Sequence, residues 1–173
     1  MGGGSRGRGP RFEEQKEFDQ TILELARVTR VTKGGKRMRF RACVIIGDRK
    51  GRVGYGIAKG LDVSQSVNKA ATQAKKRLVT VPLVNETIPH AVLMKFAAAK
   101  ILVKPAPKGT GIKAGGALRV VLELAGVPNA TGKILGSNNK INNAKAALQA
   151  LASLRKAPAK APAATAGTAA VQA

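Results

Sequence analysis

The chain has few acidic residues and few of the side chains that build catalytic or metal sites. Its 173 residues include nine Asp and Glu, one His and one Cys, against 31 Lys and Arg. A lone cysteine, Cys43, excludes a disulfide framework. With His90 as the only histidine, the sequence argues against both a His/Cys zinc site and a Ser-His-Asp triad. We therefore expect no catalytic residues, no metal and no cofactor.

Aromatic residues and long apolar runs are also scarce. There are four Phe, one Tyr and no Trp, which argues against a protein that stacks splayed single-stranded bases on aromatic rings. Contacts to phosphate, sugar and helix shape are favoured instead. No apolar run reaches the roughly 18 residues of a membrane span. The start of the chain, rich in glycine and arginine, lacks the apolar segment of a secretory signal. These absences predict a soluble, cytoplasmic protein.

Basic residues dominate what is present. The formal net charge is +22 and the pI is about 11.3. Such an excess repels itself in a compact fold unless a polyanion neutralises it, which makes nucleic acid the first partner to consider. Residues 1–60 and 91–156 are strongly basic, whereas residues 61–90 are nearly balanced. The charge therefore does not belong to a single tail on a neutral domain.

The most informative segment is KGGKRMRFRACVII, residues 33–46, because it alternates in character. Successive side chains of a strand point to opposite faces. A strand here would place apolar residues at 38, 40, 42, 44 and 46 on one face. The other face would carry Arg37, Arg39 and Arg41, after a flexible turn at Gly34 and Gly35. An apolar face backed by an arginine face favours docking on a polyanion.

Hydrophobic periodicity predicts a first domain of order βββα over residues 17–84. Segments 22–32, 37–46 and 52–58 indicate three strands, and a stripe of 3.6-residue period over 63–78 indicates a helix. A helix on one face of the sheet would leave the arginine face free. Glycines on the third strand mark the close approach either of a ligand or of that helix.

A second domain of order ββαβα is predicted over residues 85–156, so the fold class is α+β. Segments 91–96 and 100–104 indicate a hairpin, and 133–135 a third strand. A helix over 117–125 stops at Gly126, and Asn138 or Asn139 caps a final helix. Outside the domains, residues 1–16 are predicted to form a flexible basic arm and residues 157–173 a disordered Ala/Pro tail.

Three glycine-rich segments invite comparison with nucleotide-binding loops. Segment 54–60 is one residue too long for a dinucleotide fingerprint, and segment 126–133 has five residues between its glycines where a P-loop has four. Segment 108–116 precedes a helix, so its backbone N–H groups and the helix dipole could hold a phosphate. An ATP-dependent small-molecule kinase would also need carboxylates, and this half offers only Glu86 and Glu123. A phosphate of RNA is the favoured ligand.

Several motifs occur together in one protein family. The segments KGGKRMRF, VIIGDRKGRVGYG, KPAPKGTGIKAGG, LELAGV and LGSN, which start at residues 33, 44, 104, 122 and 135, resemble the family of the fifth protein of the bacterial small ribosomal subunit. The resemblance covers about residues 20–154 and implies an N-terminal domain like a double-stranded-RNA-binding domain. Two positions depart from the family pattern: Ala97 stands where glycine is usual, and Lys140 replaces the usual proline.

The resemblance implies a structural constituent of the small subunit that binds its ribosomal RNA and supports assembly beside the fourth and eighth small-subunit proteins. It also implies a position near the channel through which mRNA enters, an influence on decoding accuracy, and a loop at 32–36 that reaches toward the subunit neck near the spectinomycin site. The protein would be ribosome-bound in the cytoplasm, with no membrane partner. A free RNA chaperone or double-stranded-RNA module is the binding-class alternative, and the kinase is the enzyme-class alternative.

We expect two groups of RNA contacts and a flexible third. The first comprises Lys33, Gly34, Gly35, Lys36, Arg37, Arg39 and Arg41, extended from the next turn by Arg49, Lys50 and Arg52. The second comprises Lys108, Thr110 and Lys113, with Ser137, Asn138 and Asn139 as polar candidates nearby. The arm adds Arg6, Arg8 and Arg11, and the resemblance implies that Gly109, Gly111 and Arg119 are candidates for a protein interface.

Overall fold

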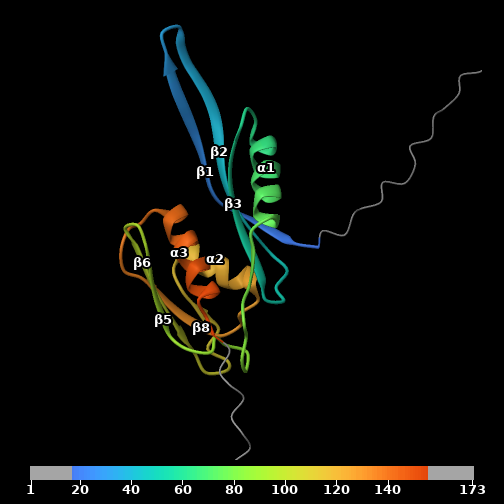
Figure 1. Ribbon diagram of the computed structural model, residues 1–173, viewed down its shortest axis with the longest axis vertical. Helices are drawn as coiled ribbons and strands as arrows, with labels where there is room; N and C mark the ends of the chain where they lie inside the picture. The colour runs from blue at the N-terminus through green and yellow to red at the C-terminus, as the bar shows by residue number, and fades with distance from the viewer. Residues whose placement is uncertain (1–16, 156–173) are drawn as a thin grey trace, which may run out of the picture.

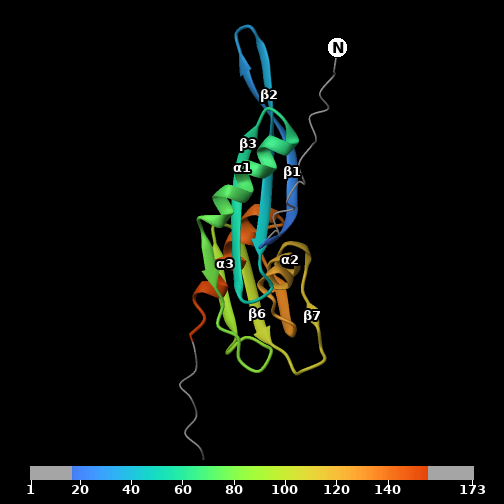
Figure 2. The same ribbon diagram turned by 90° about the vertical axis from the view of Figure 1, so that its right-hand side faces the viewer.

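Two α+β units packed end to end make up the molecule (Figures 1 and 2). The computed structural model describes residues 17–155, so the predicted arm, with Arg6, Arg8 and Arg11, and the predicted tail lie outside the described residues. The first unit contains β1 (Asp19–Thr32), β2 (Gly35–Gly47), β3 (Arg52–Gly60), α1 (Val63–Lys75) and β4 (Leu78–Thr80). The second contains β5 (Val92–Phe96), β6 (Ala99–Pro105), β7 (Ile112–Lys113), α2 (Gly116–Ala125), β8 (Ala130–Ile134) and α3 (Lys140–Ala152). The predicted α+β class is confirmed, and we propose the domain boundary between residues 84 and 85.

The first sheet has the order β1-β2-β3-β4 and is antiparallel throughout. β1 and β2 pair along their whole length, from Asp19 opposite Gly47 to Thr32 opposite Gly35. β3 follows β2 only as far as the pair of Phe40 and Gly60. Beyond that pair the sheet narrows to two strands, residues 27–40, which project from the body at the top of Figure 1. We call these residues the ribbon.

Helix α1 covers one face of this sheet at very close range. A Cβ atom placed on Gly56 of β3 would lie 1.9 Å from the carbonyl oxygen of Ala70. Of the two partners predicted for the β3 glycines, the helix is therefore the one observed. The helix stops at Lys75, and Leu78, expected inside it, instead begins the edge strand β4 opposite Gly54. A three-residue strand of this kind gives too short an alternation to be recognised in the sequence.

The second sheet has the order β5-β6-β8-β7, with only the β7–β8 pair parallel. The two-residue strand β7 is an addition to the predicted ββαβα order. α2 ends as predicted, because Gly126 takes the left-handed conformation with φ 75°. Asn139, one of the two predicted caps, accepts hydrogen bonds from the backbone N–H groups that open α3. Helices α2 and α3 each contact strands of both sheets.

One continuous core joins the two domains. Ile45 and Val53 of the first sheet are fully buried in the same cluster as Leu118 of α2 and Leu151 of α3. Ile45 lies on the same face of β2 as Arg41, because four residues separate them. The face predicted to be free is therefore covered by the second domain along its lower half. The arginine face is open only in the ribbon and directly beside it.

Candidate nucleic-acid interface

The ribbon ends in a tight, exposed turn. The hydroxyl of Thr32 donates a hydrogen bond to the carbonyl oxygen of Gly35 over 3.0 Å, which closes the turn. Gly35 has φ 136°, a region that L side chains rarely adopt, and nothing lies within 4 Å of a Cβ atom built on Gly34 or Gly35. The tip therefore presents bare backbone to its surroundings. Such a tip can approach a phosphate backbone more closely than a turn with side chains could.

Arginines from both strands gather on one face of the ribbon. Arg37 pairs across the strands with Arg30, and Arg39 pairs with Val28. Beside the ribbon, Arg41 lies opposite Lys59 of β3. Directly opposed residues share a face of the sheet, so the predicted arginine row is joined by Arg30 and Lys59. Neither residue is predicted from one strand alone, because the pattern of a single strand does not show which residues lie opposite it in the sheet. For Arg30 the available signal is the RVTRVT repeat at 27–32.

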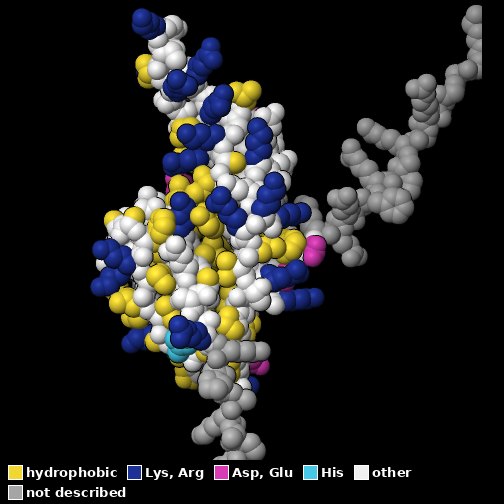
Figure 3. Space-filling model, in the orientation of Figure 1, with side chains coloured by type: hydrophobic (Ala, Val, Ile, Leu, Met, Phe, Trp, Pro, Cys, Tyr) yellow, Lys and Arg dark blue, Asp and Glu magenta, His cyan; other side chains and the backbone are white. Residues whose placement is uncertain are grey.

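The other face of the ribbon is mixed, which departs from the expected apolar burial. Met38 and Val31 are 46% and 71% exposed, and they share this face with Lys36 and Arg27. α1 contacts β2 and β3 below the ribbon. The core between α1 and the sheet contains Ala42, Val44 and Ile46 but not Met38. The ribbon thus carries positive charge on both faces, and Lys and Arg side chains line it in Figure 3.

Most of these charges lack a counterion within residues 17–155. The ion pairs of this part of the chain include none with Arg30, Arg37 or Arg39, and none with the lysines of the ribbon. Arg41 is different, because its guanidinium lies 3.0 Å from the carboxylate of Glu24. The positive charge of the ribbon is therefore available to an external anion, whereas part of the Arg41 charge is neutralised by Glu24 of the neighbouring strand.

The β2–β3 turn lies away from the ribbon, which corrects the prediction that its basic residues extend the same patch. Antiparallel pairing puts this turn at the opposite end of β2 from Gly35, about 40 Å away for 13 residues at the usual strand rise. Arg49 pairs with Asp19 at 2.8 Å and Arg52 with Asp48 at 2.6 Å. These arginines are therefore largely compensated within the protein.

Asp48 organises this turn. Its carboxylate accepts hydrogen bonds from the backbone N–H groups of Lys50 and Arg52 and from the Arg52 side chain. Burial opposes ionisation, since the side chain is 6% exposed. The hydrogen bonds to Arg52 and Lys50 outweigh burial and hold the pKa of Asp48 below its usual value. Asp48 is thus an ionised anchor for the turn rather than part of a ligand site.

The second predicted contact lies in the loop before α2. Gly109 and Gly111 both have positive φ, 84° and 70°, and neither has an atom within 4 Å of an added Cβ. The N–H of Gly111 donates to the buried amide of Asn129 over 3.1 Å, which fixes the base of the loop. Thr110 is half-buried here, Lys113 is exposed in β7, and Lys108 lies 3.7 Å from Glu86 in an exposed pair.

The polar candidates at 137–139 do not lie beside this loop. Gly111 meets Ala130 at the start of β8, whereas Ser137 follows the end of that strand and bonds to Ala98. Ser137 and Asn139 are occupied locally, because the Ser137 hydroxyl accepts from the Asn139 N–H over 3.1 Å and Asn139 caps α3. Their hydrogen bonds explain the start of the helix. Asn138 and Asn139 are both exposed, and Ser137 is half-buried.

Other classes of site find little support in the described part of the chain. Within residues 17–155, no three His, Cys, Asp or Glu side chains cluster as metal ligands do. None of the helices there is both long enough and apolar enough to cross a membrane. Glu123, one of the two carboxylates a kinase would need, is paired with Arg119 at 2.8 Å, and that pair also occupies one predicted protein-interface residue.

Comparisons with known proteins agree with the arrangement of two domains. Residues 18–82 match the family described as ribosomal protein S5, N-terminal domain, and residues 94–163 match ribosomal protein S5, C-terminal domain. The chain is 49% identical over 140 residues to the small ribosomal subunit protein uS5c of Spinacia oleracea. That alignment covers 80% of this chain and 46% of the spinach protein. The chain thus spans about half the length of that relative.

Proposed function

This chain belongs to the ribosomal protein S5 family, and from that membership we propose that it is a structural, non-catalytic constituent of the small ribosomal subunit. It binds the ribosomal RNA of that subunit and is ribosome-bound in the cytoplasm. The observation that carries the proposal is the ribbon: a two-stranded projection with a bare glycine tip and arginines that have no counterion within residues 17–155. A protein with this charge gains stability when a polyanion replaces the missing counterions.

The geometry favours contacts to phosphate and sugar on the ribbon. Arg30, Arg37 and Arg39 stand on one face at strand spacing, with no aromatic side chain between them. Arginines deliver charge and directional hydrogen bonds to phosphate oxygens. Contacts of this kind fix position and orientation on a folded RNA but carry little sequence information. The ribbon is therefore suited to holding a particular shape of ribosomal RNA.

The finer expectations from the family resemblance form part of the same proposal. The fourth and eighth small-subunit proteins are the proposed protein neighbours, and Gly109, Gly111 and Arg119 are the proposed contact residues. The ribbon tip, residues 32–36, is the part that reaches toward the subunit neck. From there the protein influences decoding near the channel through which mRNA enters. The loop around Lys108, Thr110 and Lys113 provides a second phosphate contact.

The salt dependence of RNA binding tests the central claim. The slope of log K against log salt counts neutralised phosphates at about 0.9 each. We expect the double variant Arg37→Gln/Arg39→Gln to lower the magnitude of this slope for small-subunit ribosomal RNA by about 2. The matched control is Arg49→Gln/Arg52→Gln, which removes two arginines that are already paired with carboxylates. Equal slopes for the two double variants would contradict the assignment of the ribbon.

Sedimentation separates the proposal from its alternatives. A ribosomal protein travels with the small subunit through a sucrose gradient at moderate salt, and the Arg37→Gln/Arg39→Gln variant leaves that fraction at lower salt than the control does. A free RNA chaperone would stay near the top of the gradient while still binding isolated RNA helices. Absence of the unmodified protein from small-subunit fractions would refute the ribosomal assignment.

A further inference from the structure

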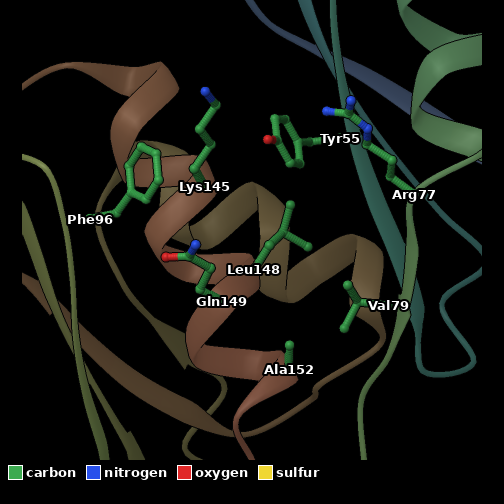
Figure 4. Close-up of a pocket in the computed structure, with 8 residues that line it drawn as sticks. All are labelled: Tyr55, Arg77, Val79, Phe96, Lys145, Leu148, Gln149 and Ala152. Atoms are coloured by element: carbon green, nitrogen blue, oxygen red, sulfur yellow. The ribbon is translucent and has the colours of Figure 1, made fainter.

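A cleft of about 200 Å³ lies at the seam between the two domains (Figure 4). Its lining comes from both sides: Tyr55, Arg77 and Val79 from the first domain, and Phe96, Lys145, Leu148, Gln149 and Ala152 from the second. Nothing in the proposed RNA contacts above uses any of these residues. Among residues 17–155 no carboxylate lines the cleft, and the charged groups there are a lysine and an arginine.

Aromatic rings and cations are combined in this cleft. Tyr55 and Phe96 are two of the chain's five aromatic residues. The ammonium group of Lys145 lies 5.9 Å from the centre of the Tyr55 ring and 5.3 Å from that of Phe96. In Figure 4 the Lys145 side chain lies between the two rings, the exposed Arg77 lies on the opposite side of Tyr55, and the buried Leu148 lies below the rings. The site therefore combines an apolar, aromatic lining with two cations.

The cleft continues the arginine face of the sheet. Tyr55 pairs with Ile45, and Lys59 pairs with Arg41, so all four side chains share one face. Moving down this face from Arg39, one passes Arg41 and Lys59 and then reaches the Tyr55 ring. Figure 3 shows the same course as Lys and Arg side chains that lead from the ribbon to an apolar area where the domains meet. An RNA strand that follows the basic face would arrive at the cleft.

We propose that this cleft receives a single unstacked nucleotide of the bound ribosomal RNA, an inference that rests on the proposed function. The base stacks against Tyr55 or Phe96, the phosphate lies between Arg77 and Lys145, and Gln149 offers amide groups to the edge of the base. The volume is below the roughly 300 Å³ at which pockets for whole drug-sized ligands begin. It suits one base rather than a free nucleoside triphosphate. An apolar side chain of a protein partner would leave both cations without an anion.

A variant that fills the cleft from its exposed rim tests this assignment without disturbing the core. Ala152 is exposed on the last turn of α3, so Ala152→Phe adds bulk at the cleft. The matched control is Ala91→Phe, the same substitution at an exposed alanine that does not line the cleft. We expect Ala152→Phe to weaken binding to small-subunit ribosomal RNA by about 5- to 150-fold, the range for losing one stacked base, and to lower the salt slope by at most about 1, for the one phosphate that is lost. Ala91→Phe should bind as the parent does. Equal binding by both variants would overturn the proposal.

Photocrosslinking identifies the occupant directly. Small subunits reconstituted with the full chain are irradiated with ultraviolet light, and a nucleotide attached to Tyr55 or Phe96 is the expected product. A crosslink from these rings to a neighbouring protein, or none to RNA, overturns the cleft proposal while leaving the ribbon assignment intact. If the Arg37→Gln/Arg39→Gln variant also keeps the parental salt slope, it is the proposed function that fails. The two outcomes are therefore distinguishable.

Discussion

The β2–β3 turn can pack against the end of α2 only because residue 126 is a glycine, which has no side chain. This residue has φ 75°, and a Cβ atom added to it would lie 2.0 Å from the carbonyl oxygen of Arg49. The turn is held there by two backbone hydrogen bonds, from the Arg49 N–H to Leu124 and from the Gly51 N–H to Ala125, at 3.1 and 3.0 Å. A methyl group would force the turn and the helix apart.

We expect Gly126→Ala to lower the free energy of unfolding by about 3–5 kcal/mol. A left-handed conformation costs a residue with a side chain about 1–3 kcal/mol. The clash is with backbone atoms, which cannot rotate away, so the two hydrogen bonds across the junction, each worth about 1 kcal/mol, are lost as well. Urea unfolding followed by circular dichroism measures the change as a shift in midpoint at constant slope.

Two further variants separate the contributions. Gly116→Ala lies at the start of the same helix with nothing within 4 Å of the added atom. It should be neutral or stabilising by up to about 1 kcal/mol. Gly126→Asn tolerates the left-handed conformation better than alanine but keeps the clash, so it should recover only part of the loss. A loss below about 1 kcal/mol for Gly126→Ala, or full recovery with asparagine, would refute the steric argument.

Three other predictions follow from charges and burial. Burial, reinforced by the charge of Glu24, raises the pKa of the Cys43 thiol to about 11, so the folded protein should not react with a thiol reagent at pH 8. The free energy of unfolding that depends on the neutral thiol should be lost only as pH rises from about 9 through 11. Reaction at the rate of a free thiol would contradict this prediction. The depressed pKa of Asp48 supplies stability that is present above about pH 4 and lost as pH falls through the folded-state value, so Asp48→Asn should flatten the decline of the urea midpoint in acid. Arg41→Gln should reduce the RNA salt slope less than Arg39→Gln does, because Glu24 already neutralises part of the Arg41 charge; equal reductions would count against that pairing in solution.

Local sequence signals predicted the elements whose boundaries depend on local chemistry. Gly126 ended α2 as its position suggested, and Asn139 capped α3 although Lys140 replaces the family's usual proline. Ala97, where the family usually has glycine, takes φ 50° in the hairpin turn. Its conformation explains the family preference, because glycine adopts positive φ without the cost that alanine incurs.

Tertiary relations were the part that the sequence did not reveal. The arginine face was expected to be free, but Ile45 on that face is buried in the core shared with the second domain, and Cys43 on the same face is also buried. A signal was present: residues 42–46 are apolar without alternation, a pattern that indicates burial on both faces. The predicted position of Arg49 and Arg52 beside the ribbon was wrong for a different reason. Adjacent turns of a meander are close in sequence but lie at opposite ends of the strand between them.

The stability of the ribbon depends on the packing between the two domains. An isolated two-stranded hairpin is marginally stable in water, so the ribbon keeps its register only because β1 and β2 continue into a sheet packed on both faces. α1 packs one face at Ala70, and the α2 and α3 core packs the other at Ile45. Loosening the seam through Gly126 should therefore weaken RNA binding without removing a charge. Such a defect lowers the fraction of competent protein by the same factor at every salt concentration, so the slope of log K against log salt stays the same. Loss of Arg39 changes that slope. The salt dependence can thus distinguish the loss of phosphate contacts from a defect of the scaffold that leaves those contacts in place.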